Sequence, residues 1–125
     1  MCIRDRRFTG QLDREQMAEL YRNADVVLNP SRVDNMPNSL LEALASGVPV
    51  VSSNVGGVPY MVEHERTALL VPAGEPEPMA DAMARLMQDP DLRTRLVDAG
   101  LAKVRGYAWP QVASTLTEIY RHALE

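Results

Sequence analysis

The sequence is poor in the features that mark secreted, metal-binding or membrane-spanning proteins. Its 125 residues include one cysteine, Cys2, which excludes a disulfide framework and a cysteine-based metal site and is typical of a reducing compartment. The longest apolar runs, residues 24–28 and 68–71, are far shorter than the ~20 residues that a membrane-spanning helix requires. We therefore expect a cytoplasmic protein with no transmembrane segment.

Clustered positive charge is also absent. The 13 lysines and arginines are scattered among 17 acidic residues, which leaves a net charge of −4. A nucleic-acid partner or a polybasic membrane contact needs clustered cations to meet phosphates, so we expect no nucleic-acid partner. His64 and His122 are isolated in the sequence. We interpret both as surface residues and expect no metal.

The length allows one compact domain, because single domains typically have about 100–200 residues. Residues 1–7 lack the order of a signal peptide. They are also largely charged, although they precede an apparent strand that ends at Phe8-Thr9-Gly10, where a buried parallel strand would carry apolar residues. We interpret residues 1–7 as a truncated or non-native start and residues 8–125 as part of a domain.

Local patterns predict where helices and strands lie. A capping-box-like start at Asp13 predicts the first helix. Asn38 or Ser39 is expected to cap a second helix, which ends before Gly47. The patterns predict helices at 13–23 and 40–46, a helical turn at 60–63, and parallel strands at 24–28, 49–52 and 68–71.

From residue 76 onward the periodicity is helical, and breaks at Asp89-Pro90 and at Gly106 divide this part into three helices. Strands that alternate with helices are typical of a layered domain with a parallel sheet. The sequence therefore predicts an α/β fold, with a Rossmann-like parallel sheet and a helical C-terminus.

Two loops follow predicted strands, where sheets of this kind bind their ligands. The first, residues 29–42, combines Asp34, a helix start at Asn38 and Ser39, and Glu42 one turn into that helix. A helix N-terminus attracts phosphate, and a carboxylate one turn later can accept hydrogen bonds from vicinal hydroxyls. This loop could therefore bind both the diphosphate and the ribose of a nucleotide.

The second loop, residues 55–59, contains Gly56 and Gly57. Two adjacent glycines remove the side chains that would keep another group away from the backbone. We therefore expect a ligand to approach the backbone of this loop.

These loops resemble the signature of family 4 glycosyltransferases, which are retaining enzymes with the GT-B fold. The family pattern P-S-x-x-E-G-F-P-N-S-L-L-E-A-L-A-S-G-x-P-V-V-S is similar to PSRVDNMPNSLLEALASGVPVVS at residues 30–52. The patterns G-G-x-P-E and G-x-L-V-P-x-G-D are similar to GGVPY at 56–60 and LLVPAGE at 69–75. With Phe8-Thr9-Gly10 and the tyrosine and aspartate of residues 20–25, the resemblance covers nearly all of the chain after Arg7.

The resemblance implies a partial nucleotide-sugar-binding domain, in which the nucleotide-sugar is a substrate and no cofactor is needed. It implies that Asp34 lies by the donor sugar and that Glu42 accepts from the ribose hydroxyls. The remaining donor-binding positions are implied in three groups: the loop residues Asn35, Met36 and Pro37 with Asn38 and Ser39 at the sugar and diphosphate, Gln11 and Leu12 near the nucleobase, and Gly56 and Gly57 in support of the pocket.

Three positions depart from the family pattern. Asp34 stands where the family usually has glutamate, Asn35 and Met36 replace Gly-Phe, and Tyr60 replaces an acid. The aspartate carboxylate is one methylene short, and the loop loses the conformational freedom of glycine. We interpret these changes as the mark of a divergent subfamily or of an altered choice of donor.

The resemblance also implies what the chain does not carry. GT-B enzymes place the acceptor site and a catalytic histidine in an N-terminal domain, and a cationic Arg/Lys pair for the diphosphate in the first half of the C-terminal domain. We therefore expect this chain to be inactive alone and to need that N-terminal domain, with a glycan, a lipid or a small molecule as the acceptor. The full-length protein could lie at the membrane periphery.

Two other functions remain open. The chain could be a non-catalytic nucleotide-sugar-binding or interaction module, which the changes at Asp34 and Tyr60 favour. Another GT-B enzyme, such as a sugar-nucleotide epimerase, is also possible. A phosphorylase would need a pyridoxal-phosphate lysine, and the only lysine, Lys103, lies far from both loops in the sequence.

Overall fold

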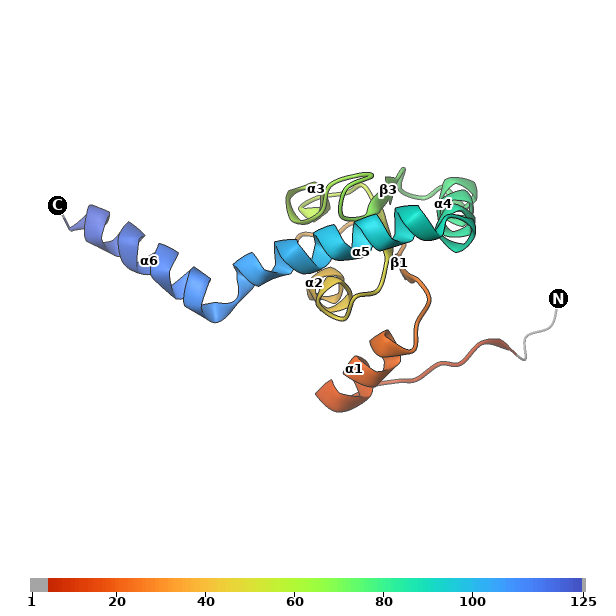
Figure 1. Ribbon diagram of the computed structural model, residues 1–125, viewed down its shortest axis with the longest axis horizontal. Helices are drawn as coiled ribbons and strands as arrows, with labels where there is room; N and C mark the ends of the chain where they lie inside the picture. The colour runs from red at the N-terminus through yellow and green to blue at the C-terminus, as the bar shows by residue number, and fades with distance from the viewer. Residues whose placement is uncertain (1–4, 125) are drawn as a thin grey trace.

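The computed structural model describes residues 5–124 and contains a small sheet with helices around it (Figure 1). Residues 1–4 of the suspected non-native start lie outside the described residues. The elements are α1 Arg14–Arg22, β1 Val27–Asn29, α2 Asn38–Ala45, β2 Val50–Ser53, α3 Val58–Met61, β3 Leu69–Val71, α4 Pro76–Gln88, α5 Pro90–Val104, the 3-10 helix η2 Arg105–Tyr107 and α6 Trp109–Ala123.

The three described strands form one parallel sheet in the order β1-β2-β3. Val27 lies opposite Val50, and Val51 lies opposite Leu69. Parallel neighbours need a crossover, and α2 and α3 supply the two crossovers here. The predicted α/β class, with a parallel sheet and a helical C-terminus, is confirmed.

Each face of the sheet packs against different helices, because successive strand residues point to opposite faces. On β2, Val50 belongs to a buried cluster with Leu40 of α2 and Met61 of α3. The next residue, Val51, belongs to a second cluster with Leu96 of α5, which also includes Leu86 and Leu92. The sheet therefore lies between α2 and α3 on one face and α4 and the start of α5 on the other, and the second half of α5 packs against α2, where Gly100 lies next to Leu44.

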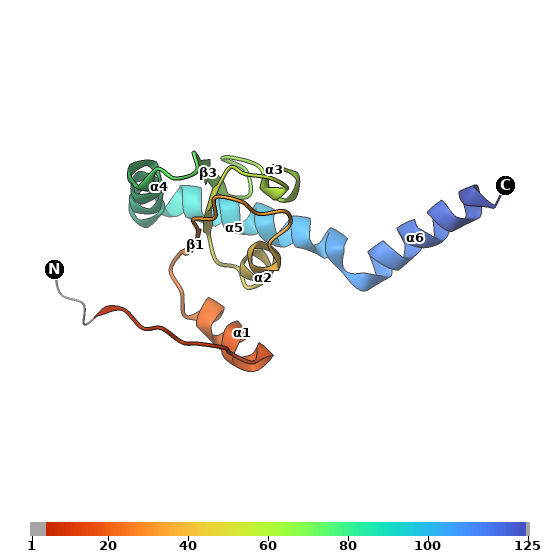
Figure 2. The ribbon, with the colours of Figure 1, turned by 180° about the vertical axis from the view of Figure 1, so that it is seen from behind.

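Helix α1 lies beyond α2, on the side of α2 that faces away from α3 and β3 (Figures 1 and 2). Asp13 and Gln16 form the predicted capping box. The Gln16 amide donates to Asp13 Oδ1 at 2.9 Å, and the Asp13 amide donates to Gln16 Oε1 at 3.0 Å. This local bonding satisfies two amides of the first turn and sets where α1 begins.

Four local predictions are wrong. Strand β1 begins at Val27, three residues later than predicted, and includes Asn29. Residues 6–10 form no strand, and Phe8 is 94% exposed, because no described strand lies beside them to supply hydrogen bonds. Neither Asn38 nor Ser39 caps α2: both lie inside its first turn, and Pro37 holds the cap position with an extended backbone. Helix α3 begins at Val58, two residues earlier than predicted, because a proline is tolerated in the first turn.

Ion pairs connect the segment between α3 and β3 to helices α4 and α5. Glu63 accepts from Lys103 of α5 at 3.1 Å and from Arg66 at 2.9 Å, and Glu65 pairs with Arg85 of α4. The hydrogen bond from Lys103, followed by that from Arg66, lowers the pKa of Glu63 below its ordinary value. These contacts lie on the surface, so we expect them to align the elements more than to stabilise them.

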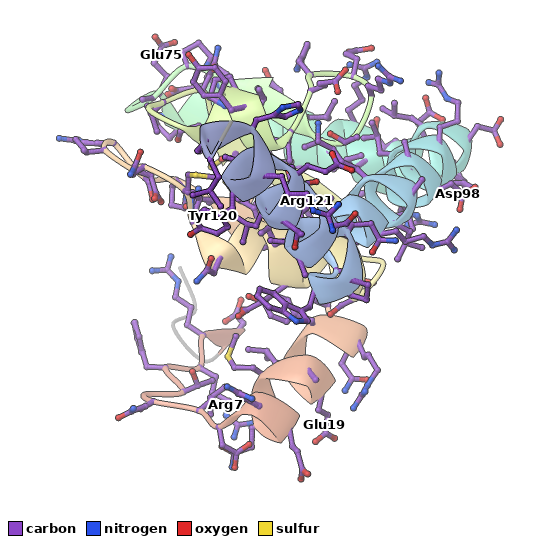
Figure 3. All side chains as sticks on the ribbon, turned by 90° about the vertical axis from the view of Figure 1, so that its left-hand side faces the viewer. Arg7, Glu19, Glu75, Asp98, Tyr120 and Arg121 are labelled. Carbon is purple, nitrogen blue, oxygen red and sulfur yellow. The ribbon has the colours of Figure 1, made fainter. Side chains whose placement is uncertain are left out.

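Helix α6 extends away from the rest of the domain (Figure 1). None of its residues is buried, and its large side chains Trp109, Ile119 and Tyr120 are 70%, 56% and 66% exposed. Figure 3 looks along the molecule from this end and shows Tyr120 and Arg121 on the projecting helix. No helix in residues 5–124 is both long and apolar enough to cross a membrane.

Candidate functional site

The first candidate loop leaves the sheet at the end of β1 and is fixed there by side-chain hydrogen bonds. Asn29 Nδ2 donates to Ser52 Oγ on β2 at 3.1 Å, and Ser31 Oγ donates to Asn29 Oδ1 at 2.8 Å. Ser52 is fully buried. The start of the loop is therefore held against the neighbouring strand, at the edge where a parallel sheet presents its loops to ligands.

The two glycines of the second loop contact the backbone of the first. The Gly57 amide donates to the Asp34 carbonyl oxygen at 3.2 Å. A Cβ atom on Gly57 would lie 1.6 Å from the Asn35 carbonyl oxygen, and one on Gly56 would lie 1.8 Å from that of Asp34. The space that the glycine side chains leave is thus filled by the other loop, and the glycines support the loop that carries Asp34.

Helix α2 begins directly after this loop, and its first two residues, Asn38 and Ser39, are exposed. The first amides of a helix have no acceptor within it and lie at the positive end of the helix dipole. Within the loop, Asp34 is half-buried, whereas Asn35 and Met36 are exposed. The structure therefore places a carboxylate and a helix N-terminus in sequence along one continuous segment.

Glu42 lies one turn into α2, and its carboxylate is held by a tyrosine of α1. The Tyr21 hydroxyl donates to Glu42 Oε2 at 3.1 Å and lies 3.5 Å from the carbonyl oxygen of Ser39. Burial raises the pKa of Tyr21 to about 12, and the hydrogen bond and the negative charge of Glu42 add to the increase. The tyrosine therefore keeps its proton and remains a donor at neutral pH.

A cavity lies between α1 and α2. Its volume of about 620 Å³ is within the range of small-molecule sites. We refer to it as the α1–α2 cavity. Glu42 is in its wall, and so is Leu12, which sequence reasoning assigns to the nucleobase. The full lining is Leu12, Asp13, Arg14, Met17, Ala18, Tyr21, Glu42, Ala45 and Ser46.

The predicted site residues thus fall into two groups joined by the start of α2. Leu12 and Glu42 face one cavity, whereas Asp34, Asn35, Gly56 and Gly57 form the loop contact. Gln11 is exposed next to Leu12. A second cavity, of about 540 Å³ beside Leu28, Arg32 and Met79, contains none of the predicted site residues.

Sequence reasoning did not identify Tyr21 and Arg14 as site residues, although both line the α1–α2 cavity. Tyr21 falls at an apolar position of the helical pattern, so the periodicity marks it as core. Its polar tip is the feature that could have drawn attention, because a buried tyrosine hydroxyl usually has a partner. Within residues 5–124, no cluster of three or more histidine, cysteine, aspartate or glutamate side chains could hold a metal ion.

Comparisons of this chain with a family model and with individual proteins agree on one family. The family model for glycosyl transferases group 1 matches residues 3–89. The D-inositol 3-phosphate glycosyltransferase of Saccharomonospora viridis is 36% identical over 118 residues, which are 94% of this chain and 27% of that protein. The enzyme of the same name from Kribbella flavida is 37% identical over 119 residues, 95% of this chain and 28% of that protein.

Solved structures give the same result. The sucrose-phosphate synthase of Thermosynechococcus elongatus is similar with a TM-score of 0.84 and 34% identity, over 94% of this chain and 30% of that one. HepE of Anabaena, solved in complex with UDP-glucose, has a TM-score of 0.72 over 82% of this chain and 30% of that one. At 23% identity, HepE shows the fold alone.

The family model covers more than half of this chain, and the relatives agree with it. The chain spans just over a quarter of the length of the curated relatives given above. The sequence, the fold and the comparisons lead to one conclusion: the chain belongs to the glycosyl transferases group 1 family, whose domains have the GT-B fold.

Proposed function

We propose that this chain supplies the donor site of a retaining family 4 glycosyltransferase, which moves a sugar from a nucleotide-sugar to a hydroxyl acceptor. The observation that carries the proposal is the position of Glu42. Glu42 lines the α1–α2 cavity and lies one turn from the N-terminus of α2. The complex of HepE with UDP-glucose supports the class of donor, because HepE shares the fold.

In this proposal the donor lies along α2. The diphosphate meets the amides at Asn38 and Ser39, where the helix dipole favours negative charge. The ribose hydroxyls donate to Glu42, and the base lies towards Leu12. Asp34 approaches the sugar from the loop that the glycines support.

The rest of the enzyme is proposed to come from an N-terminal domain of the same protein. That domain would supply the acceptor site and the catalytic histidine, for a glycan, lipid or small-molecule acceptor. The exposed side chains Trp109, Ile119 and Tyr120 give α6 an apolar surface that such a domain could cover. The chain alone is then inactive, and neither a metal nor a cofactor takes part. The complete protein is proposed to be cytoplasmic, at the membrane periphery where its acceptor is a lipid.

A non-catalytic nucleotide-sugar-binding module is a second candidate. Tyr60 stands where the family usually has an acid, and it is 84% exposed near the glycine loop. A module of this kind would bind donor without transferring sugar. Sugar transfer by the complete protein to a hydroxyl acceptor would exclude it.

The proposal predicts that Glu42→Ala weakens the binding of nucleoside diphosphates by about 10- to 100-fold, because hydrogen bonds to a charged group contribute about 1.5–3 kcal/mol. The measurement is a calorimetric titration of the chain with UDP and with GDP. Glu118→Ala is the matched control, since Glu118 is an exposed glutamate on α6. This variant should bind UDP and GDP with the affinity of the unmodified chain. An unchanged affinity in Glu42→Ala would remove Glu42 from the site.

A further inference from the structure

We propose that Tyr21 is a positioning residue, which holds the Glu42 carboxylate in the orientation that receives the ribose. This inference rests on the proposed function. Its basis is the contact between two helices that are distant in sequence: the Tyr21 hydroxyl of α1 donates to Glu42 Oε2 of α2 at 3.1 Å.

The two partners differ in how firmly they are held. Tyr21 is only 7% exposed, and its ring belongs to the buried cluster of Leu40 and Leu44, so the position of its hydroxyl is set by packing. Glu42 is an exposed side chain with several rotatable bonds. The hydrogen bond to this fixed hydroxyl therefore restricts the Glu42 side chain, which would otherwise sample several rotamers.

The backbone around Tyr21 also favours a fixed position. The capping box at Asp13 sets the start of α1, and the Asn23 amide donates to the Glu19 carbonyl oxygen at 3.1 Å at its end. The Tyr21 hydroxyl also lies 3.5 Å from the Ser39 carbonyl oxygen, in the first turn of α2. The hydroxyl is thus placed against both the carboxylate and the helix that carries it.

This arrangement leaves room for a ligand. The tyrosine uses Oε2, and an ionised carboxylate has about four lone-pair sites, so acceptors remain for two ribose hydroxyls. A side chain that is already ordered loses less rotamer freedom when the ligand binds, which strengthens binding. The raised pKa of Tyr21, about 12, keeps the hydroxyl protonated as a donor across the neutral range.

The test compares nucleotides that have and lack the hydroxyls. UDP, GDP and their 2′,3′-dideoxy counterparts are titrated by calorimetry into the chain, Tyr21→Phe, Glu42→Ala and the double variant. We expect Tyr21→Phe to weaken the preferred nucleotide about 3- to 10-fold, with the dideoxy form unchanged, because one charged hydrogen bond orders the carboxylate. In the Glu42→Ala background, Tyr21→Phe should add no further loss.

A control and a second measurement separate positioning from folding. Tyr120→Phe removes a hydroxyl from a tyrosine of α6 that is 66% exposed, and it should leave both affinities unchanged. Thermal unfolding of each variant shows whether it is folded. Equal weakening of the preferred nucleotide and its dideoxy form by Tyr21→Phe would show a purely structural role and overturn the inference.

The Glu42→Ala data distinguish this inference from the function on which it rests. If Glu42→Ala reduces the preference for the ribose hydroxyls and Tyr21→Phe does not, only the positioning role fails. If Glu42→Ala leaves that preference intact, the ribose assignment fails, and the positioning role fails with it.

Discussion

Replacing Gly57 with alanine is expected to lower the free energy of unfolding by about 3 kcal/mol and to weaken nucleotide binding at least about tenfold. The added Cβ would lie 1.6 Å from the Asn35 carbonyl oxygen and 2.7 Å from its carbonyl carbon. These are backbone atoms, so the clash cannot be relieved by a side-chain rotation. The Gly57 backbone angles, φ −84° and ψ −7°, suit any residue, so the cost is steric. Urea unfolding and calorimetry with UDP and GDP measure the two effects.

Gly106→Ala is the matched control. A Cβ on Gly106 meets nothing within 4 Å, and its unfolding free energy should stay within about 0.5 kcal/mol of the unmodified chain. If Gly57→Ala were as stable as Gly106→Ala and bound nucleotide normally, the glycines would not hold the loop that carries Asp34.

Replacing Leu40 with alanine is expected to cost about 2–5 kcal/mol of stability, because the smaller side chain leaves a cavity in a packed core. Leu40 is 0% exposed and belongs to the same buried cluster as Val50 of β2 and Met61 of α3. It lies on α2 between Ser39 and Glu42, so its packing also places the proposed donor-binding residues against the sheet. Urea unfolding measures the loss.

The control for this substitution is Leu116→Ala on α6. Leu116 is 39% exposed and belongs to a helix with no buried residue, so its truncation should cost less than about 0.5 kcal/mol. Equal costs at the two positions would contradict the assignment of α2 to the core.

The sequence predicted well what depends on neighbouring residues. The capping box at Asp13 needs only residues within one helical turn, and it was found as expected. The strands around Val50 and Leu69 are short aliphatic runs whose two faces both meet helices, which is the pattern of a buried parallel strand. Local propensity and tertiary packing agree at these places.

The predictions that failed depend on contacts between distant residues or on which of several neighbouring residues caps a helix. The strand expected at Phe8 needs neighbouring strands, which the described residues do not provide. Helix α2 begins at Asn38, because Pro37 adopts the extended conformation of a cap residue although it supplies no side-chain acceptor. Residue preferences for the cap position favour Asn38 and Ser39, so they could not identify Pro37 as the cap.

Some contacts of the candidate site could not be predicted from the sequence either. The motif identified both acids and both glycines, but not that Gly57 lies against Asn35, 22 positions earlier in the chain. Nor could periodicity show that the Tyr21 hydroxyl reaches Glu42. Both contacts join separate loops or helices, so only the folded chain reveals how the site residues are supported.

Binding of the donor nucleotide by α2 and the α1–α2 cavity can be followed through the backbone amide resonances of the chain, recorded by NMR during titration with UDP and with GDP. We expect the largest shifts at Asn38, Ser39 and Glu42, with further shifts at Leu12 and Tyr21. Shifts confined to the second cavity, around Leu28 and Met79, would contradict it, as would the absence of any shift at saturating nucleotide.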